Sequence, residues 1–197
     1  MSVEPSSAPG DPLIWVLRDE RPGTDNQSLG VADALGRSYV IKDLRYGPMA
    51  RLPNMLLGAS LRVLTAGSRT NISPPWPDVV ISAGRRAASV ARYIKRVSGG
   101  HCFVCHLMYP GPRQSASLDL VAVPAHDEVV GPNVVAVTGA PHRVTETLLA
   151  DARATWRGPW KDIPRPILGV LVGGAGRRMP FEYPTVSGKT KVECLGQ

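Results

Sequence analysis

A glycine and two arginines follow the strand-like run 78–82, where Gly84, Arg85 and Arg86 open a segment with helical spacing. Glycine lets the backbone approach a ligand closely, a helix N-terminus attracts negative charge, and a guanidinium group donates paired hydrogen bonds to a phosphate or carboxylate. The pattern indicates an anion-binding loop. A glycine turn beside two solvated arginines is an equally open alternative.

A second loop of this type follows the strand-like run 134–137. It contains Gly139, His142 and Arg143 and leads into another helical segment. Two such loops at strand ends in one domain favour a cleft that binds an anionic ligand.

The first strand-like run also ends in polar residues, which we expect to form a loop before a helix that stops at Gly36. In an open α/β sheet, ligands bind beyond the carboxyl ends of the strands, so this loop stands where a site is built. The candidate contacts in it are Arg18, Asp19, Arg21, Pro22, Gly23, Asp25, Asn26 and Gln27.

His126 and Asp127 follow the run 118–123 at the same expected sheet edge. A catalytic base held by a carboxylate would need such a pair, but no serine or cysteine nucleophile motif accompanies it. We therefore favour a ligand contact by His126 or an ordering of its loop, and we assign no catalytic residue.

Cys102 and Cys105 form a CxxC motif flanked by histidines, which is typical of zinc or redox sites. The segment reads as a buried strand, however, and strand alternation places the two cysteines on opposite faces. No second ligand pair stands at metal spacing. We expect these thiols to pack in the core, and we predict no metal.

Two glycine-containing segments near the C-terminus match nucleotide motifs only in part. After 173–176 the dinucleotide fingerprint requires a third glycine where Met179 stands, and before 187–190 a P-loop requires a glycine where Tyr183 stands. We predict no cofactor from them.

The formal charge of +7 and the pI of about 9.7 make nucleic acid or an anionic membrane surface conceivable partners. The arginines are scattered, and no basic block alternates with aromatic residues, which argues against nucleic acid. No apolar run has the ~20 residues of a transmembrane helix. Residues 1–12 lack the features of a secretory signal, and the odd cysteine count argues against a disulfide framework, so we expect a disordered leader and a cytoplasmic protein.

Strand-like runs alternate with helical segments along most of the chain, which predicts an α/β fold with a Rossmann-like, doubly wound parallel sheet over residues 13–159. A Pro-rich linker is expected at 160–166, and 167–197 would hold the first strand of an incomplete second domain and an irregular tail. The expected strands are 13–17, 39–41, 78–82, 101–108, 118–123, 134–137 and 167–172, and the expected helices end at Gly36 or span 54–64, 85–97 and 143–156.

Several short motifs in order resemble the mitochondrial-fission family, known from plant proteins and many uncharacterised bacterial homologues. The resemblance covers about residues 13–174. The motifs are Trp15-Val16-Leu17, Arg21-Pro22-Gly23, Asp25-Asn26-Gln27, Gly30 with Ala34-Leu35-Gly36, Trp76-Pro77-Asp78, Gly84-Arg85-Arg86, Asp119-Leu120-Val121, Pro124 with His126-Asp127, Gly139-Ala140 with His142-Arg143, and Leu171-Val172-Gly173-Gly174.

That resemblance implies a fold similar to the glycosyltransferase-B enzymes, whose two Rossmann-like domains face a cleft and whose nucleoside-diphosphate-sugar donor sits mainly on the C-terminal domain. It also implies a link to the division of mitochondria and peroxisomes, since the plant members act at the mitochondrial outer surface. At Leu107-Met108-Tyr109-Pro110 the chain departs from the amide and acid that usually precede this proline in the family.

Three functions follow from these observations. The leading hypothesis is a truncated bacterial homologue with an anion-binding, glycosyltransferase-B-like N-terminal domain, no complete donor site and no activity alone. One alternative is a scaffold or adaptor protein that recruits a protein partner in organelle or membrane division. The other is a sugar-nucleotide-dependent glycosyltransferase in full-length form.

Overall fold

The computed structural model describes residues 10–52, 57–164 and 166–169. The chain divides into two compact units, Met1–Leu149 and Ala150–Gln197, and each is described by itself. The first unit contains the sheet and every predicted contact residue.

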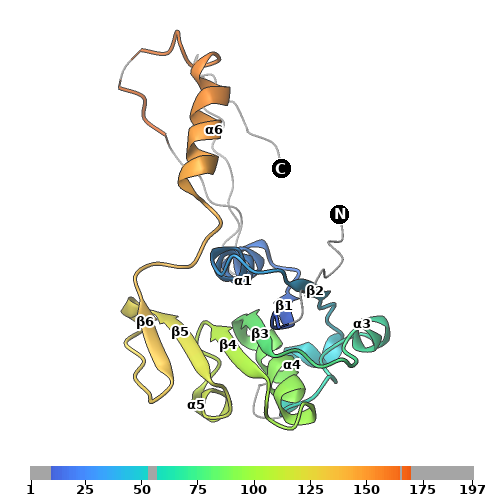
Figure 1. Cartoon of the computed structure of the whole chain (residues 1–197). Helices are drawn as coiled ribbons and strands as arrows, with labels where there is room; N and C mark the ends of the chain where they lie inside the picture. The colour runs from blue at the N-terminus through green and yellow to red at the C-terminus, as the bar shows by residue number, and fades with distance from the viewer. Residues whose placement is uncertain (1–9, 53–56, 165, 170–197) are drawn as a thin grey trace. The chain divides into compact units, whose positions relative to one another are not determined.

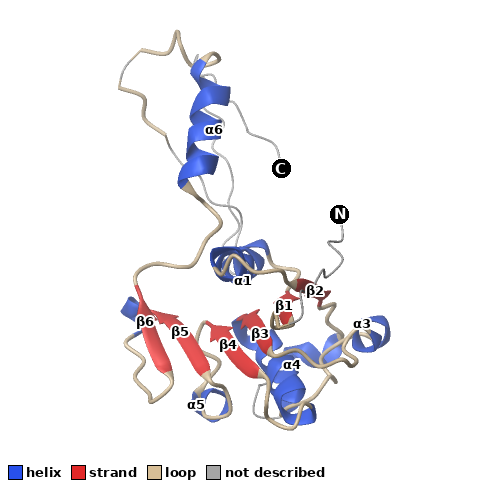
Figure 2. Cartoon of the chain, viewed as in Figure 1, coloured by secondary structure: helices blue, strands red, loops and turns tan. Residues whose placement is uncertain are grey.

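Six parallel strands form one sheet in the order β2-β1-β3-β4-β5-β6 (Figure 2). This topology confirms the predicted α/β, Rossmann-like doubly wound fold. The strands are β1 (Ile14–Arg18), β2 (Val40–Asp43), β3 (Val79–Ala83), β4 (Phe103–Leu107), β5 (Leu120–Pro124) and β6 (Val134–Val137).

Helices lie on both faces of this sheet. α1 (Pro22–Ala34) covers one face, and α4 (Gly84–Val97) lies on the other together with the short helices α3 (Ala66–Thr70) and α5 (Pro112–Ser115) (Figure 1). Two 3₁₀ turns, η1 (Pro48–Arg51) and η2 (Ala125–Asp127), follow β2 and β5. The last described helix, α6 (Glu146–Arg157), spans the boundary between the two units.

Burial on both faces explains why the inner strands read as continuous apolar runs. In β3, Val80 packs in the large cluster on the α4 side, whereas its neighbour Ile81 packs with α1 residues. The edge strand β2 instead alternates half-buried and exposed residues. The sheet therefore carries a hydrophobic core on each of its two faces.

In the first unit the structure differs from two of the expected segments. Residues 58–64 are not helical: Gly58 has a φ of +57°, and Leu64 forms an isolated antiparallel bridge with Tyr46, so the helix expected over 54–64 is wrong in this part. Residues 53–56 lie outside the described range. The loop expected to reach Gln27 is also wrong, because α1 already begins at Pro22, where a proline needs no hydrogen-bonded N–H.

The C-terminal expectations fall mostly outside the described residues. Residues 167–169 carry no strand, whereas 170–172 and the glycine motif at 173–176 are not described. Within the second unit, Trp156 and Trp160 stack with their ring centroids 5.1 Å apart.

Candidate functional site

The carboxyl edge of the sheet holds a topological switch point between β1 and β3. From β1 the chain enters α1 on one face, and from β3 it enters α4 on the opposite face, which is the position where ligands bind in such sheets; we refer to this place on the edge as the crevice. The two helix N-termini meet there, because a Cβ atom placed on Gly84 would lie 3.0 Å from Thr24 Cγ2. Gly84 has a φ of +78°, which favours glycine.

Neither helix N-terminus is capped by a side chain. The N-cap residues are Arg21 for α1 and Ala83 for α4, and neither donates or accepts a capping hydrogen bond through its side chain. The first backbone N–H groups of a helix have no partner within the helix. In α1, Pro22 has no N–H, the Arg21 N–H donates to Asp19 Oδ1 and the Thr24 N–H donates to the Arg21 carbonyl oxygen, so the Gly23 amide is the donor left for a ligand. The first-turn amides of α4 and the positive ends of both helix dipoles also face the crevice.

A buried ion pair joins the two loops behind this crevice. The Arg86 guanidinium donates to Asp19, and these side chains are only 17% and 4% exposed. The Arg86 guanidinium carbon also lies 4.0 Å from the centroid of the Tyr46 ring. Burial, and secondarily the Asp19 carboxylate, raises the pKa of Tyr46, so its hydroxyl stays neutral. Arg86 is thus matched by a carboxylate and holds the loops together.

The neighbouring Arg85 binds backbone rather than the crevice. Its guanidinium donates to the carbonyl oxygens of Ala50 and Leu52, each at 2.9 Å. Arg85 therefore fixes the segment around η1. Arg18, at the end of β1, pairs with Asp43 at the end of β2, and both of these side chains stay well exposed.

Asp25 lies in the first turn of α1 with one carboxylate oxygen fully buried. This Oδ1 atom has no hydrogen-bond partner among the described residues. Burial raises the pKa of Asp25, while the positive charges of Arg18 and Arg143 counteract the rise. The carboxyl group can accept a hydrogen bond from a ligand hydroxyl. The adjacent Asn26 is exposed, and Gln27 is half-buried.

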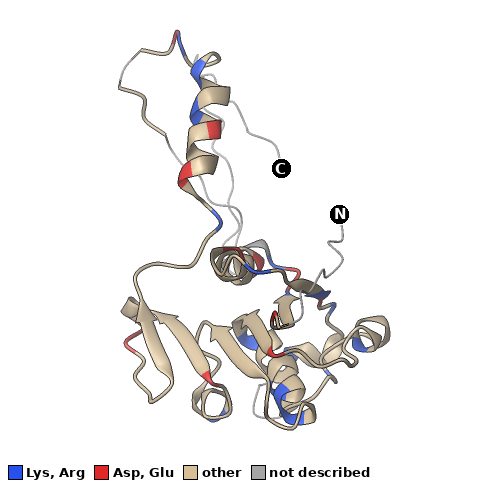
Figure 3. Ribbon diagram, viewed as in Figure 1, with Lys and Arg blue, Asp and Glu red and all other residues tan. Residues whose placement is uncertain are grey.

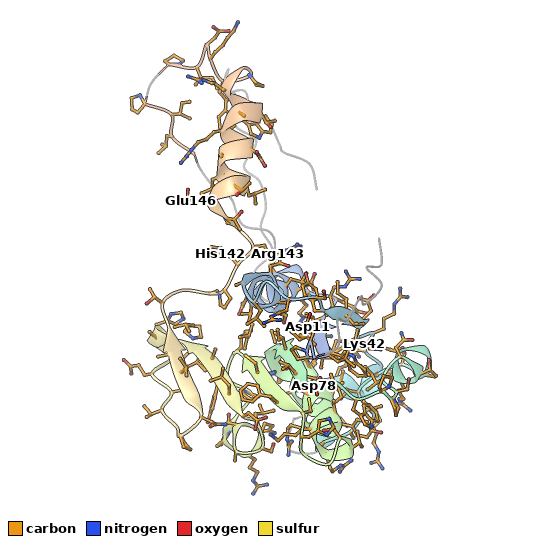
Figure 4. The ribbon with its side chains drawn as sticks, in the orientation of Figure 1. Asp11, Lys42, Asp78, His142, Arg143 and Glu146 are labelled. Atoms are coloured by element: carbon orange, nitrogen blue, oxygen red, sulfur yellow. The ribbon has the colours of Figure 1, made fainter. Side chains whose placement is uncertain are left out.

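The third predicted loop runs along α1. A Cβ atom on Gly30 would lie 2.7 Å from the carbonyl carbon and oxygen of His142, so the backbones are in close contact. Arg143 Nε donates to Asp33 Oδ2 at 2.8 Å, and Tyr39 donates to Asp33 Oδ1 at 2.6 Å. Burial alone would raise the pKa of Asp33, but these two hydrogen bonds lower it. Figure 4 shows His142 and Arg143 beside α1.

The structure therefore brings two of the three predicted loops together at one point. The loop after β1 and the loop after β3 meet through Asp19 and Gly84, whereas Arg143 binds Asp33, eight residues or about 12 Å along α1 from Asp25. Gly139 adopts a φ of +73° just before this segment. His126 Nε2 lies 3.6 Å from Asp127 Oδ1 on an exposed turn.

Sequence reasoning missed a buried Ser–His pair in the sheet. His106 on β4 is fully buried, and its Nδ1 lies 2.8 Å from the Ser82 hydroxyl oxygen on β3. Its Nε2 has no partner among the described residues, and burial lowers the pKa of His106 to about 4. The neighbouring thiols of Cys102 and Cys105 pack in separate hydrophobic clusters, as opposite-face positions require. The strand alternation in the segment HCFVCH was the signal that could have predicted the burial of Cys102, Cys105 and His106.

The described residues form neither a cluster of metal ligands nor a membrane-spanning helix. In that part of the chain, no three histidine, cysteine or acidic side chains gather as a metal site. Its helices also include none with the length and apolar character needed to cross a bilayer.

Comparison with known proteins gives related sequences. A model of the family described as "Mitochondrial fission ELM1" matches residues 22–191. An uncharacterized protein of Rickettsia prowazekii is 32% identical over 115 residues, which cover 58% of this chain and 32% of that protein. The mitochondrial fission protein ELM1 of Arabidopsis thaliana is 24% identical over 141 residues, which cover 60% of this chain and 33% of that protein. The match spans about a third of the length of these curated relatives. No solved structure matches.

Proposed function

Because the chain belongs to the mitochondrial fission ELM1 family, we propose that its N-terminal α/β domain binds a phosphate-bearing ligand at the crevice between β1 and β3. The observation that carries this proposal is the meeting of two helix N-termini that no side chain caps. Amide donors from two helices, aimed at one place on the sheet edge, suit an anion that accepts several hydrogen bonds.

The surrounding residues define which part of the ligand each would contact. The amides of Gly23 and Gly84 lie in the first turns of the two helices and would face the phosphate oxygens. Arg21 is exposed at the N-cap of α1 and adds positive charge there, whereas the charge of Arg18 is paired with that of Asp43. The half-buried Asp25 carboxyl group would accept a hydrogen bond from a hydroxyl, which a nucleoside-diphosphate sugar supplies beside its phosphates.

We further propose that this domain corresponds to the N-terminal half of a glycosyltransferase-B-like architecture. The six-stranded parallel sheet with helices on both faces supports the comparison. The match spans about a third of the length of the curated relatives. A complete donor site and a transferase reaction are therefore proposed only for a full-length protein that contains this domain. The two free, buried thiols fit action in a reducing compartment such as the cytoplasm.

Residue-resolved titration tests the proposed ligand site. A uridine-diphosphate sugar is added to ¹⁵N-labelled protein at constant ionic strength, and amide chemical shifts are followed. We expect saturable shifts at Gly23, Thr24 and Gly84 with a dissociation constant on the order of 1 mM, which corresponds to about −4 kcal/mol. Shifts that never saturate, or that spread over the whole basic surface, would overturn the proposal.

Two matched variants separate a site from general charge attraction. Arg18→Gln removes an exposed, aspartate-paired arginine beside the crevice, and Arg37→Gln removes one whose partner is Asp11, remote from the crevice. Each variant loses the same charge and one exposed ion pair. We expect weaker binding only in Arg18→Gln, and equal weakening in both would indicate a diffuse electrostatic effect.

A scaffold function is the second candidate, and one surface feature favours it. On the sheet face that carries α1, Phe103 on β4 is 45% exposed and Val135 on β6 is 47% exposed. Exposed apolar side chains of this kind occur at protein interfaces. A photo-crosslinking amino acid at Val135 should capture one discrete protein in cells, while the same probe at Arg37 should not. Equal labelling at both positions would remove this candidate.

A further inference from the structure

A second, separate cationic feature lies on α4 near its C-terminus. Here the surface forms a groove of about 560 Å³, lined by Ala59, Arg92, Lys95, Arg96, Gly100 and Ser117. Figure 3 shows basic residues along this part of α4. Since α4 starts at the carboxyl edge and runs back along the sheet, ten residues separate Arg86 from Arg96, or about 15 Å.

One of the three cations in this α4 groove is already matched. The Lys95 ammonium group pairs with both carboxylate oxygens of Asp119. Asp119 Oδ2 also accepts the backbone N–H of Val104 at 2.8 Å, which ties this carboxylate to the start of β4. Asp119 is therefore committed to Lys95 and to the sheet.

The two arginines of the α4 groove have no such partner. Arg92 Nε donates to the Ser117 hydroxyl at 2.6 Å, and the Arg96 guanidinium lies 5.7 Å from the centroid of the Tyr93 ring. Within the described ranges, no carboxylate lies in ion-pair distance of either guanidinium. By contrast, Arg18 and Arg86 each pair with an aspartate.

The positive charges of Arg92 and Arg96 repel each other because of their spacing on α4. Arg92 and Arg96 are four residues apart, so they lie on the same side of α4 and repel. Burial, followed by the charge of Arg96, lowers the pKa of Arg92. An anion placed between the two guanidinium groups would remove this repulsion and receive paired hydrogen bonds.

We propose that the α4 groove binds a small molecule that carries a phosphate monoester or diphosphate group. Two uncompensated guanidinium groups match a dianion, because the third cation is neutralised by Asp119. The volume lies within the ~300–1,000 Å³ range of small-molecule sites. This site is independent of the crevice at the carboxyl edge.

Titration with inorganic pyrophosphate tests this proposal on the full chain. At constant ionic strength, the amides of Gly100 and Ser117 should show saturable chemical-shift changes. In an Arg92→Gln/Arg96→Gln double variant the apparent dissociation constant should rise at least about tenfold, because two charge-assisted contacts are lost. In Arg45→Gln, which removes an exposed arginine after β2, the constant should be unchanged.

The remaining outcomes each decide the matter. A charge-reversal variant, Arg96→Glu, keeps Arg92 and its contact with Ser117. It should also abolish saturable pyrophosphate binding, while its far-ultraviolet circular dichroism spectrum stays unchanged. Pyrophosphate shifts that are linear, or equal in all variants, would overturn the proposal. So would binding to phosphatidylserine vesicles that depends on Arg96 without saturable pyrophosphate binding. Shifts confined to Gly23 and Gly84 would support the crevice while rejecting the α4 groove.

Discussion

Removal of the Asp19 carboxylate should destabilise the N-terminal unit far more than removal of an exposed carboxylate on the same sheet edge. Deleting one partner of a fully buried ion pair costs about 3–5 kcal/mol, because a charge is left without its partner. Arg86 keeps 17% of its side-chain surface and the face of Tyr46, so partial hydration remains. We therefore expect Asp19→Ala to cost about 2–3 kcal/mol, below that range.

The matched control is Asp43→Ala, which breaks the pair with Arg18. Those side chains are 40% and 53% exposed, and exposed pairs contribute about 0–1 kcal/mol. Urea unfolding followed by circular dichroism measures both variants. With a dependence of about 1–3 kcal/mol per molar urea, Asp19→Ala should lower the midpoint by about 1–2 M and Asp43→Ala by much less.

A double-variant cycle identifies the cause of the loss. If the unpaired charge is responsible, Asp19→Ala/Arg86→Met should be no less stable than Asp19→Ala, because the buried guanidinium is then also gone. Equal losses in Asp19→Ala and Asp43→Ala, or additive losses in the double variant, would refute the reasoning.

Two further predictions concern other buried contacts of this unit. Burial lowers the pKa of His106 to about 4 in the folded state, against 6.5 in the unfolded state, so the unfolded state binds more protons between these two pH values. The contribution of His106 to the free energy of unfolding is therefore complete above pH 6.5 and should fall by about 2 kcal/mol from pH 7 to pH 5. His106→Asn should abolish that His106 component of the unfolding free energy, while the exposed His126→Asn should keep it. Gly30→Ala would place a Cβ atom 2.7 Å from the His142 backbone and should lower the free energy of unfolding in urea by about 1–3 kcal/mol. The control Gly67→Ala, whose Cβ meets nothing within 4 Å, should not lower it, and equal effects of the two variants would contradict the close contact.

The strands were predictable because each is a short apolar run with a clear end. β6 was predicted at 134–137 and found there, and β3 is displaced from its predicted range by one residue. Helix boundaries were less accessible where local signals conflict. Around 54–64 the apolar spacing is helical, but Gly58 and the bridge of Leu64 to Tyr46 impose a turn that only tertiary packing reveals.

The candidate residues were predictable by position but not by partner. The sequence places Arg85 and Arg86 after a strand, yet Arg85 binds backbone carbonyls and Arg86 binds Asp19, 67 residues away in the sequence. Such pairings depend on which strands become neighbours, and no local pattern encodes that. The same holds for Ser82 and His106, which meet because β3 and β4 pair in register.

The segment after β6 also sets the order in which this unit can be completed during synthesis. Asp33 lies on the first helix, and its partner Arg143 is translated 110 residues later. At about 5–20 residues per second, the ribosome needs roughly 5–20 s to cover that interval. Throughout this time the α1 surface around Gly30 lacks its final neighbour, so the nascent chain presents an unfinished helix face to chaperones. The contact between α1 and the segment around Arg143 is therefore among the last that the nascent domain can form, and contacts between residues so far apart in the sequence favour slow folding.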